Sequence, residues 1–144
     1  MFQERARSRI GPVQMAVILA ALFTAAVHIY LAVTPNSPEP QLRLPFWLAA
    51  LGYLGAVTAL YAPLGFLEPL RWLARLALMG VTVSTIIAYF VVVGFVFDAL
   101  SLTDKSVEGL LVILLVADAV SARAVRTVRT TRTRDEEIGS RVAA

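Results

Sequence analysis

Cysteine is absent from the 144-residue sequence, and histidine occurs once, as His28. A chain without cysteine forms no disulfide and no thiolate metal site, and one histidine cannot supply both ligands of a bis-histidine haem. Charged residues are also scarce, at 16% of the chain, whereas 58% of the residues are hydrophobic. Soluble domains have about 25% charged and about 45–50% apolar residues. A domain of this size could not bury so much apolar surface in water, so we expect lipid to cover it.

Four long apolar runs account for this excess, and they cover residues 13–34, 45–62, 73–97 and 107–125. Each is close to the length of about 20 residues that a helix needs to cross a hydrocarbon core about 30 Å thick. Pro35 and Pro63 follow the first two runs, and a polar turn with Asp98, Asp104 and Glu108 separates the last two. The runs lack the alternation of β-strands, and each helix in lipid satisfies its own backbone hydrogen bonds. The sequence therefore predicts an all-α membrane protein, a bundle of four transmembrane helices.

The basic residues predict how these spans are oriented. Eleven of the 13 Lys and Arg residues lie in or beside the N-terminal segment 1–12, the connection between the second and third runs, and the C-terminal segment 126–144. The other two are Arg43 and Lys105. The positive-inside rule then predicts a multi-pass protein of the cell membrane with both termini in the cytoplasm. The first run exceeds the about 7–15 apolar residues of a signal peptide, so we expect it to remain as a span.

His28 lies inside the first run, where an ionisable side chain is costly and therefore suggests a function. It could bind a haem or chlorin, relay a proton, or hydrogen-bond a quinone. The alternative is a neutral imidazole that bonds to a hydroxyl on another run, such as Thr58, Thr85 or Tyr89. A bis-ligated haem would need its second ligand from a partner or from a methionine. We expect no cofactor, with haem or chlorin at His28 as the open alternative.

Asp118 lies inside the fourth run, where its carboxyl group must be protonated or paired. Arg71, Arg75 and Arg123 are candidate partners at the same end of the run. A structural ion pair is one interpretation, and a carboxylate that couples transport to protons is the other. The rise per residue puts Asp118 and His28 about 10 Å apart in depth, so we treat them as two separate sites.

A cluster of arginines follows the fourth run and comprises Arg123, Arg126, Arg129 and Arg132. Such a cluster beside a span attracts anionic lipid headgroups by about 1 kcal/mol per charge. The alternative is that these charges only set the orientation of the span. Nucleic acid is not expected as a partner, because no folded module or aromatic platform accompanies the charges.

Small residues recur at steps of four along every run, as a helix needs for close packing in lipid. They are Ala16, Ala20, Thr24, Gly52, Ala56, Gly80, Ser84, Ala88, Ala117 and Ser121. We interpret these stripes as contacts within the bundle. The alternative is that one of them binds a membrane-protein partner or a second copy of the chain.

Three short motifs resemble known sequences: His28–Leu31, Leu44–Phe46 and Leu51–Ala56. Over its first two runs, the chain resembles small uncharacterised four-span membrane proteins of haloarchaea. The resemblance implies a four-span fold, and it implies no activity, cofactor or site residue. The basic residues between 123 and 134 depart from the acidic cytoplasmic segments typical of extreme halophiles.

No catalytic set is visible in the sequence. A Gly-rich phosphate loop, a metal-spaced cluster and a Ser-His-Asp set are all missing, so we expect neither an enzyme nor a metal site. The leading hypothesis is a non-enzymatic accessory or scaffolding subunit of a larger membrane complex. One alternative is a small proton-coupled transporter or channel that uses Asp118, and another is an electron-transfer subunit that binds a cofactor at His28.

Overall fold

The computed structural model describes residues 10–34, 42–92, 94 and 98–142, with side chains described as far as Ser121. Every element in these residues is helical, as the sequence predicts. The elements are α1 (Pro12–Val33), α2 (Arg43–Tyr61), the short 3-10 helix η2 (Gly65–Leu70), α3 (Arg71–Val92) and α4 (Ala99–Val142). Three helical segments, Pro12–Val33, Arg43–Tyr61 and Gly65–Val92, are long and apolar enough to cross a membrane.

The first two helices begin and end where local chemistry directs. Pro12 occupies the first position of α1, where its missing N–H has no partner to lose, and the Gln14 side chain accepts a hydrogen bond from the Gly11 N–H at 3.0 Å. The Thr34 N–H closes the last turn on the carbonyl of Tyr30. Helix α2 begins slightly before the predicted residue 45, so Pro45 lies in its first turn.

The fourth helix is longer at both ends than the sequence predicted. Asp98 caps it by accepting hydrogen bonds from the N–H groups of Leu100 and Ser101. The Ser101 hydroxyl also donates to Asp98, and this bond, together with the backbone bonds, lowers the pKa of Asp98. The polar turn predicted to contain Asp104 and Glu108 is therefore helical, which corrects the start expected at residue 107. The start at residue 107 was predicted from hydropathy, which detects apolar residues and therefore does not detect the polar first turns of α4. At the other end, α4 continues to Val142, past the expected residue 125.

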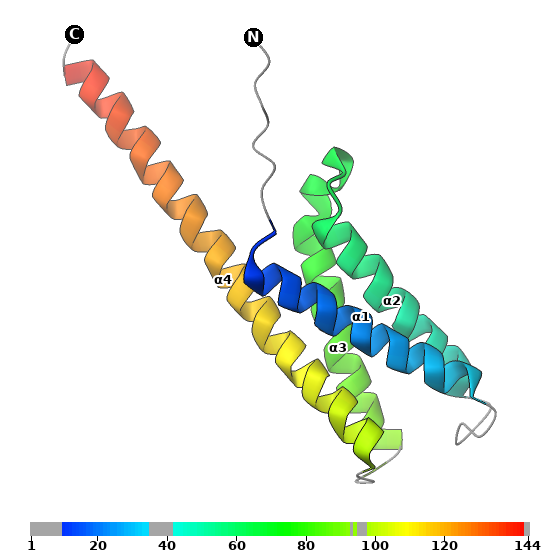
Figure 1. Cartoon of the computed structure of the whole chain (residues 1–144). Coiled ribbons are helices and arrows are strands. Elements are labelled where there is room, and N and C mark those ends of the chain that lie inside the picture. The colour runs from blue at the N-terminus through cyan, green and yellow to red at the C-terminus, as the bar shows by residue number, and fades with distance from the viewer. Residues whose placement is uncertain (1–9, 35–41, 93, 95–97, 143–144) are drawn as a thin grey trace.

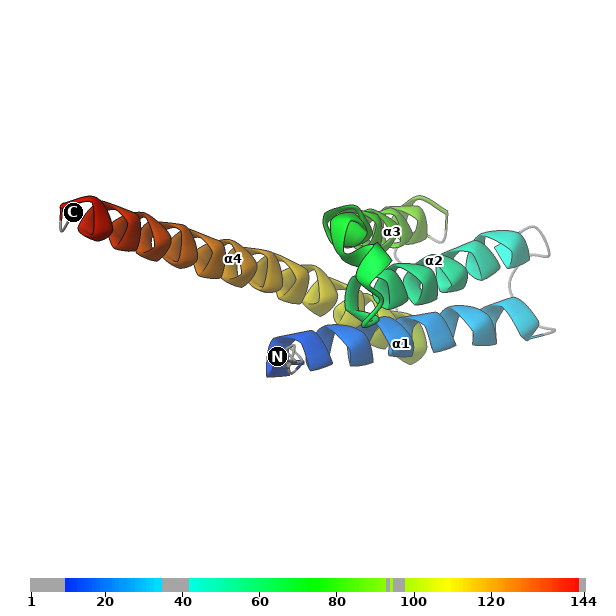
Figure 2. The same ribbon diagram turned by 90° about the horizontal axis from the view of Figure 1, so that it is seen from above.

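The four long helices pack in a ring, in which α1 and α3 each contact α2 and α4. The start of α1, η2 and the middle of α4 lie toward one end of the bundle, which we call the η2 end (Figure 1). The end of α1, the start of α2, the end of α3 and the start of α4 lie toward the other, which we call the Leu42 end. Seen from above in Figure 2, the C-terminal half of α4 extends beyond the other helices.

The interior of the bundle is built from small and branched apolar side chains. Its buried members include Val17, Ala21, Tyr53, Leu78, Leu111 and Leu115. Large apolar side chains also cover the outside, with Leu19, Leu51, Leu76, Ile87 and Ile113 all exposed. A water-soluble protein rarely exposes so continuous an apolar surface, and lipid is the solvent that suits it.

The small-residue stripes divide between the inside and the outside of the bundle. On α1 and α2, Ala20, Thr24 and Ala56 are buried, so the interpretation as internal contacts holds there. On α3, Gly80, Ser84 and Ala88 are exposed, and so are Ala117 and Ser121 of α4. Internal packing is therefore the wrong interpretation for these two helices. The buried residues of α3 are instead Ala74, Leu78 and Thr82.

Gly52 of α2 packs against Val81 of α3, and its replacement by alanine should destabilise the bundle. A Cβ at Gly52 would lie 3.0 Å from Cγ2 of Val81, whereas a Cβ at Gly55 would meet no atom within 4 Å. We expect Gly52→Ala to lower the thermal unfolding midpoint in detergent, because overpacking costs about 1–3 kcal/mol. Gly55→Ala is the control and should be neutral or stabilising. Adding Val81→Ala should restore Gly52→Ala, and equal stability of the two single variants would contradict this packing.

A buried histidine–carboxylate cluster as the candidate functional site

Asp104 and Glu108 of α4 form one side of a buried polar cluster. They are four residues apart, so both project from the same face of the helix, the face that continues into Leu111 and Leu115. Glu108 is 0% exposed and Asp104 is 3% exposed. Charged side chains reach such burial only when a partner compensates them, so the rest of the cluster decides how these carboxylates are held.

Glu108 accepts hydrogen bonds from three helices. Its Oε1 atom accepts from the Tyr53 hydroxyl of α2 at 3.0 Å and from the Thr85 hydroxyl of α3 at 2.7 Å. Its Oε2 atom accepts from the Lys105 ammonium, one turn earlier on α4, at 2.6 Å. Charge-assisted bonds of this kind are the strong ones, so Glu108 ties α2 and α3 to α4 at one point.

His28 supplies the fourth helix of the cluster. It is 3% exposed, and its Nδ1 atom lies 2.8 Å from the Thr24 carbonyl. A carbonyl only accepts, so Nδ1 carries a proton and Nε2 of the neutral ring has a free lone pair. Nε2 faces Glu108 Oε1 at 3.9 Å, and the ring packs against Phe46 and Tyr53. The partner found is thus a carbonyl of the same helix, whereas the sequence suggested a hydroxyl on another run.

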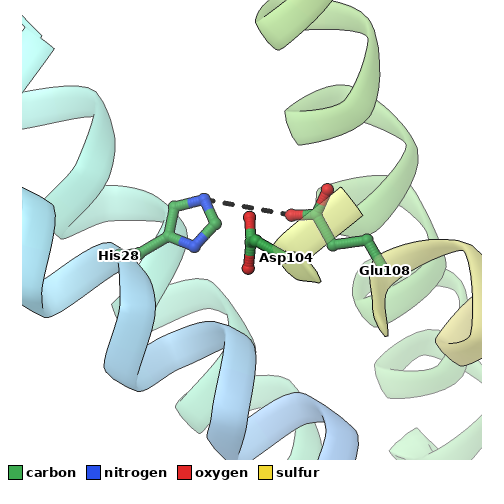
Figure 3. A group of neighbouring side chains, drawn as sticks. All are labelled: His28, Asp104 and Glu108. Atoms are coloured by element: carbon green, nitrogen blue, oxygen red, sulfur yellow. Dashed lines mark ion pairs between the residues drawn. The ribbon is translucent and has the colours of Figure 1, made fainter. Parts of the chain in front are cut away.

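Asp104 lies between His28 and Glu108, as Figure 3 shows. Its Oδ2 atom is 3.1 Å from the Lys105 ammonium. Its Oδ1 atom is buried and has no hydrogen-bond partner among the described residues. One donor atom each from His28, Asp104 and Glu108 fall within 4.8 Å of one another. The cluster therefore brings three potential ligands together and leaves one carboxylate oxygen unsatisfied.

The charges of the cluster do not balance. Two carboxylates face one ammonium, that of Lys105, within the described part of the chain. An uncompensated buried negative charge is unfavourable, so the site favours further positive charge, from a proton or a metal cation. The 3.9 Å between His28 Nε2 and Glu108 suits such small species. Haem or chlorin at His28 stays an alternative from the sequence.

Two hydroxyls give the cluster alternative hydrogen bonds. The Thr85 hydroxyl lies 2.7 Å from Glu108 Oε1 and 2.8 Å from the Thr82 carbonyl, but its single proton can serve only one of them. The Tyr53 hydroxyl lies 3.0 Å from both Glu108 Oε1 and the Thr85 hydroxyl. If Tyr53 donates to Thr85 and Thr85 donates to Thr82, Glu108 Oε1 is released. The carboxylate can thus be bound or freed without a change of backbone.

Asp118 belongs to a second, separate polar site. It is 6% exposed, and its Oδ2 atom lies 2.6 Å from the Arg75 guanidinium, one of the three partners that the sequence suggested. Along α4, Leu111 and Leu115 separate Asp118 from Glu108 by about 15 Å. The two sites therefore lie at different depths, with the Arg75–Asp118 pair nearer the η2 end.

The predicted lipid-binding arginines are helical in the structure but are not described further. Arg123, Arg126, Arg129 and Arg132 lie within the backbone of α4, and their side chains lie outside the described residues. Their contact with anionic lipid stays a prediction.

Comparisons with known proteins found no relative of this chain. No family model matches the chain, and neither curated proteins nor solved structures give a match. The site therefore stands on its own residues. The sequence analysis missed Asp104, Lys105 and Glu108 as site residues because it assigned them to a polar turn. The pattern that could have revealed them is the pair of acids at 104 and 108, which share a helix face with Leu111 and Leu115.

Asp118→Asn tests the second site. The variant keeps the shape of the side chain but leaves Arg75 without its anionic partner. We therefore expect the unfolding free energy to fall by about 1–3 kcal/mol. This is less than for a fully buried pair, because Arg75 is partly exposed. Thermal unfolding in detergent measures it, with Ser121→Ala as the control. The double variant with Arg75→Gln should recover part of the loss. Equal destabilisation of the single and double variants would argue against the pair.

Proposed function

We propose that this chain is a non-enzymatic membrane protein with four spans, and that it takes up and releases protons at the His28–Glu108 site as a small proton-coupled transporter. One observation carries the proposal: Glu108 is wholly buried, faces the free Nε2 of His28 at 3.9 Å, and shares one ammonium with a second carboxylate. Buried ionisable residues within a membrane bundle are typical of proton relays.

Helix α4 is proposed as the fourth span. It packs against α1 and α3, and its acids Asp104, Glu108 and Asp118 are buried within the bundle. Its outward side carries Leu110, Ile113, Val116 and Val120, which are exposed and apolar. A helix can cross lipid with charged residues when they face the bundle interior, so the acids do not oppose a span.

The orientation is proposed from the distribution of basic residues. Arg71 and Arg75 belong to the η2 end, together with the start of α1 and the extension of α4. The positive-inside rule would put this end in the cytoplasm and the Leu42 end, with His28 and Glu108, toward the outer surface. Proton exchange at the cluster would then face the outside.

The proposal moves the coupling role from Asp118 to Glu108. Asp118 has a guanidinium partner at 2.6 Å, which favours a structural ion pair. Glu108 has hydroxyl partners that can rearrange and a histidine that can exchange a proton with it. A carboxylate whose environment tolerates both charge states is the better coupling group.

Proton flux in vesicles tests the proposal. The purified chain is reconstituted into lipid vesicles that enclose a pH-sensitive dye. The outside solution is then made more acidic than the interior, and the membrane potential is clamped with potassium and valinomycin. We expect wild-type vesicles to acidify faster than protein-free vesicles, and Glu108→Gln to fall to the protein-free rate. Asp118→Asn should retain flux, and Asp98→Asn, which alters an exposed acid on the same helix, is the control. Undiminished flux in folded Glu108→Gln would end the proposal.

A second candidate function is the accessory or scaffolding subunit suggested by the sequence. The observation that favours it is the exposure of Gly80, Ser84 and Ala88 on α3, a helix with few buried residues. Small residues on a lipid-facing side suit close approach by another membrane helix.

Co-purification tests this candidate. The chain is extracted from native membranes in mild detergent, and we expect Gly80→Leu to lose any stoichiometric partner by steric exclusion. Gly55→Leu is the matched control, because Gly55 is also exposed and has open space around it. A lone monomer in the wild-type preparation would count against a subunit role.

A further inference from the structure

We propose that His28, Asp104 and Glu108 bind one divalent transition-metal ion of the Zn²⁺ class. The inference concerns the same cluster as the proposed function and rests on its burial within the bundle, but it does not require proton flux. The ligands would be Nε2 of His28 and one oxygen from each carboxylate. They come from α1 and α4, so the ion would join the first and last helices of the ring.

The distances suit a single small ion. The three donor atoms lie within 4.8 Å of one another, and His28 Nε2 is 3.9 Å from Glu108 Oε1. With metal–ligand distances of about 2.0–2.2 Å, the donors around a tetrahedral ion are about 3.3–3.6 Å apart. Small side-chain rotations would therefore close the site, without movement of the helices.

In its neutral form, His28 has the tautomer that binds metal through Nε2. The Thr24 carbonyl accepts from Nδ1 at 2.8 Å, which fixes the proton there and leaves the Nε2 lone pair facing the carboxylates. Metal-bound histidines almost always have such a partner on the other nitrogen. The ring is also held in place by Phe46 and Tyr53, so little side-chain freedom would be lost on binding.

Each carboxylate has an oxygen available for the ion. Asp104 Oδ1 is buried and without a partner among the described residues, and Asp104 lies between His28 and Glu108 (Figure 3). Glu108 Oε1 is released when Tyr53 and Thr85 donate to their alternative acceptors. Lys105 bonds to the other oxygens, Asp104 Oδ2 and Glu108 Oε2. It can therefore remain in place, although its charge opposes a cation.

The mixed donor set selects the class of ion. Imidazole nitrogen suits Zn²⁺ and its neighbours, whereas Mg²⁺ and Ca²⁺ prefer sites made of oxygen alone. Two carboxylates and one ammonium leave a net charge of −1, and a divalent ion changes it to +1. Three protein ligands would leave a fourth coordination position open.

Zinc binding by the full chain in detergent tests the inference. The protein is treated with a chelator, dialysed, and titrated with Zn²⁺ by calorimetry, with Ca²⁺ as the comparison ion. We expect one Zn²⁺ per chain and no Ca²⁺ binding at the same concentrations. His28→Ala and Asp104→Asn should each weaken Zn²⁺ binding by at least about 100-fold, more than the loss of a second-sphere partner. Asp98→Asn, on the same helix but exposed, should bind as the wild type does.

Lys105→Met keeps the test decisive if the buried variants fail to fold. It removes the cation that competes for both carboxylates, so we expect Zn²⁺ to bind more tightly, and misfolding cannot produce a gain. No Zn²⁺ binding by the folded wild type, or unchanged binding in His28→Ala and Lys105→Met, would overturn the inference. Zinc binding without proton flux would refute only the proposed transport, whereas flux without zinc binding would refute only the metal site.

Discussion

The hydrogen bonds that the Glu108 carboxylate accepts connect the helices of the bundle. Three of the helical segments are long and apolar enough to cross a membrane, and in lipid the contacts between helices would have to come from close packing and hydrogen bonds. Glu108 receives bonds from α2 and α3 and a lysine of its own helix, and it faces the histidine of α1. All four long helices therefore meet around one buried anion. The same anion creates the chemistry of the site, because holding it within the bundle demands compensation by protons or cations.

The two polar sites divide the bundle into layers. Near the η2 end, Arg75 and Asp118 compensate each other directly. Toward the Leu42 end, the cluster of His28, Asp104 and Glu108 has, among the described residues, one oxygen without a hydrogen-bond partner and more negative than positive charge. Apolar residues such as Leu111 separate the layers. The first site is a compensated ion pair, whereas the second has one more carboxylate than ammonium groups among the described residues.

The helical class and the long apolar segments could be predicted from the sequence, because hydropathy reports directly on lipid exposure. The Arg75–Asp118 pair could also be anticipated, since a lone buried acid needs a basic partner at its own depth. The cluster could not, because Asp104 and Glu108 resemble a solvated turn until α4 is known to begin at Ala99. Likewise, nothing in the spacing of Gly80, Ser84 and Ala88 distinguishes an inward stripe from an outward one.

The uninterrupted length of α4 gives the molecule a mechanical property. Its 44 residues correspond to about 66 Å, roughly twice the thickness of a hydrocarbon core. The segment that carries Asp104 and Glu108 is thus continuous with a projecting segment of about 30 Å. Glu108 lies about 50 Å from Val142 along the helix, so a tilt of about 10° at Glu108 would move the end of α4 by about 9 Å. A change in the packing of the buried cluster that tilts α4 would therefore produce a larger displacement at the C-terminal end of the same helix.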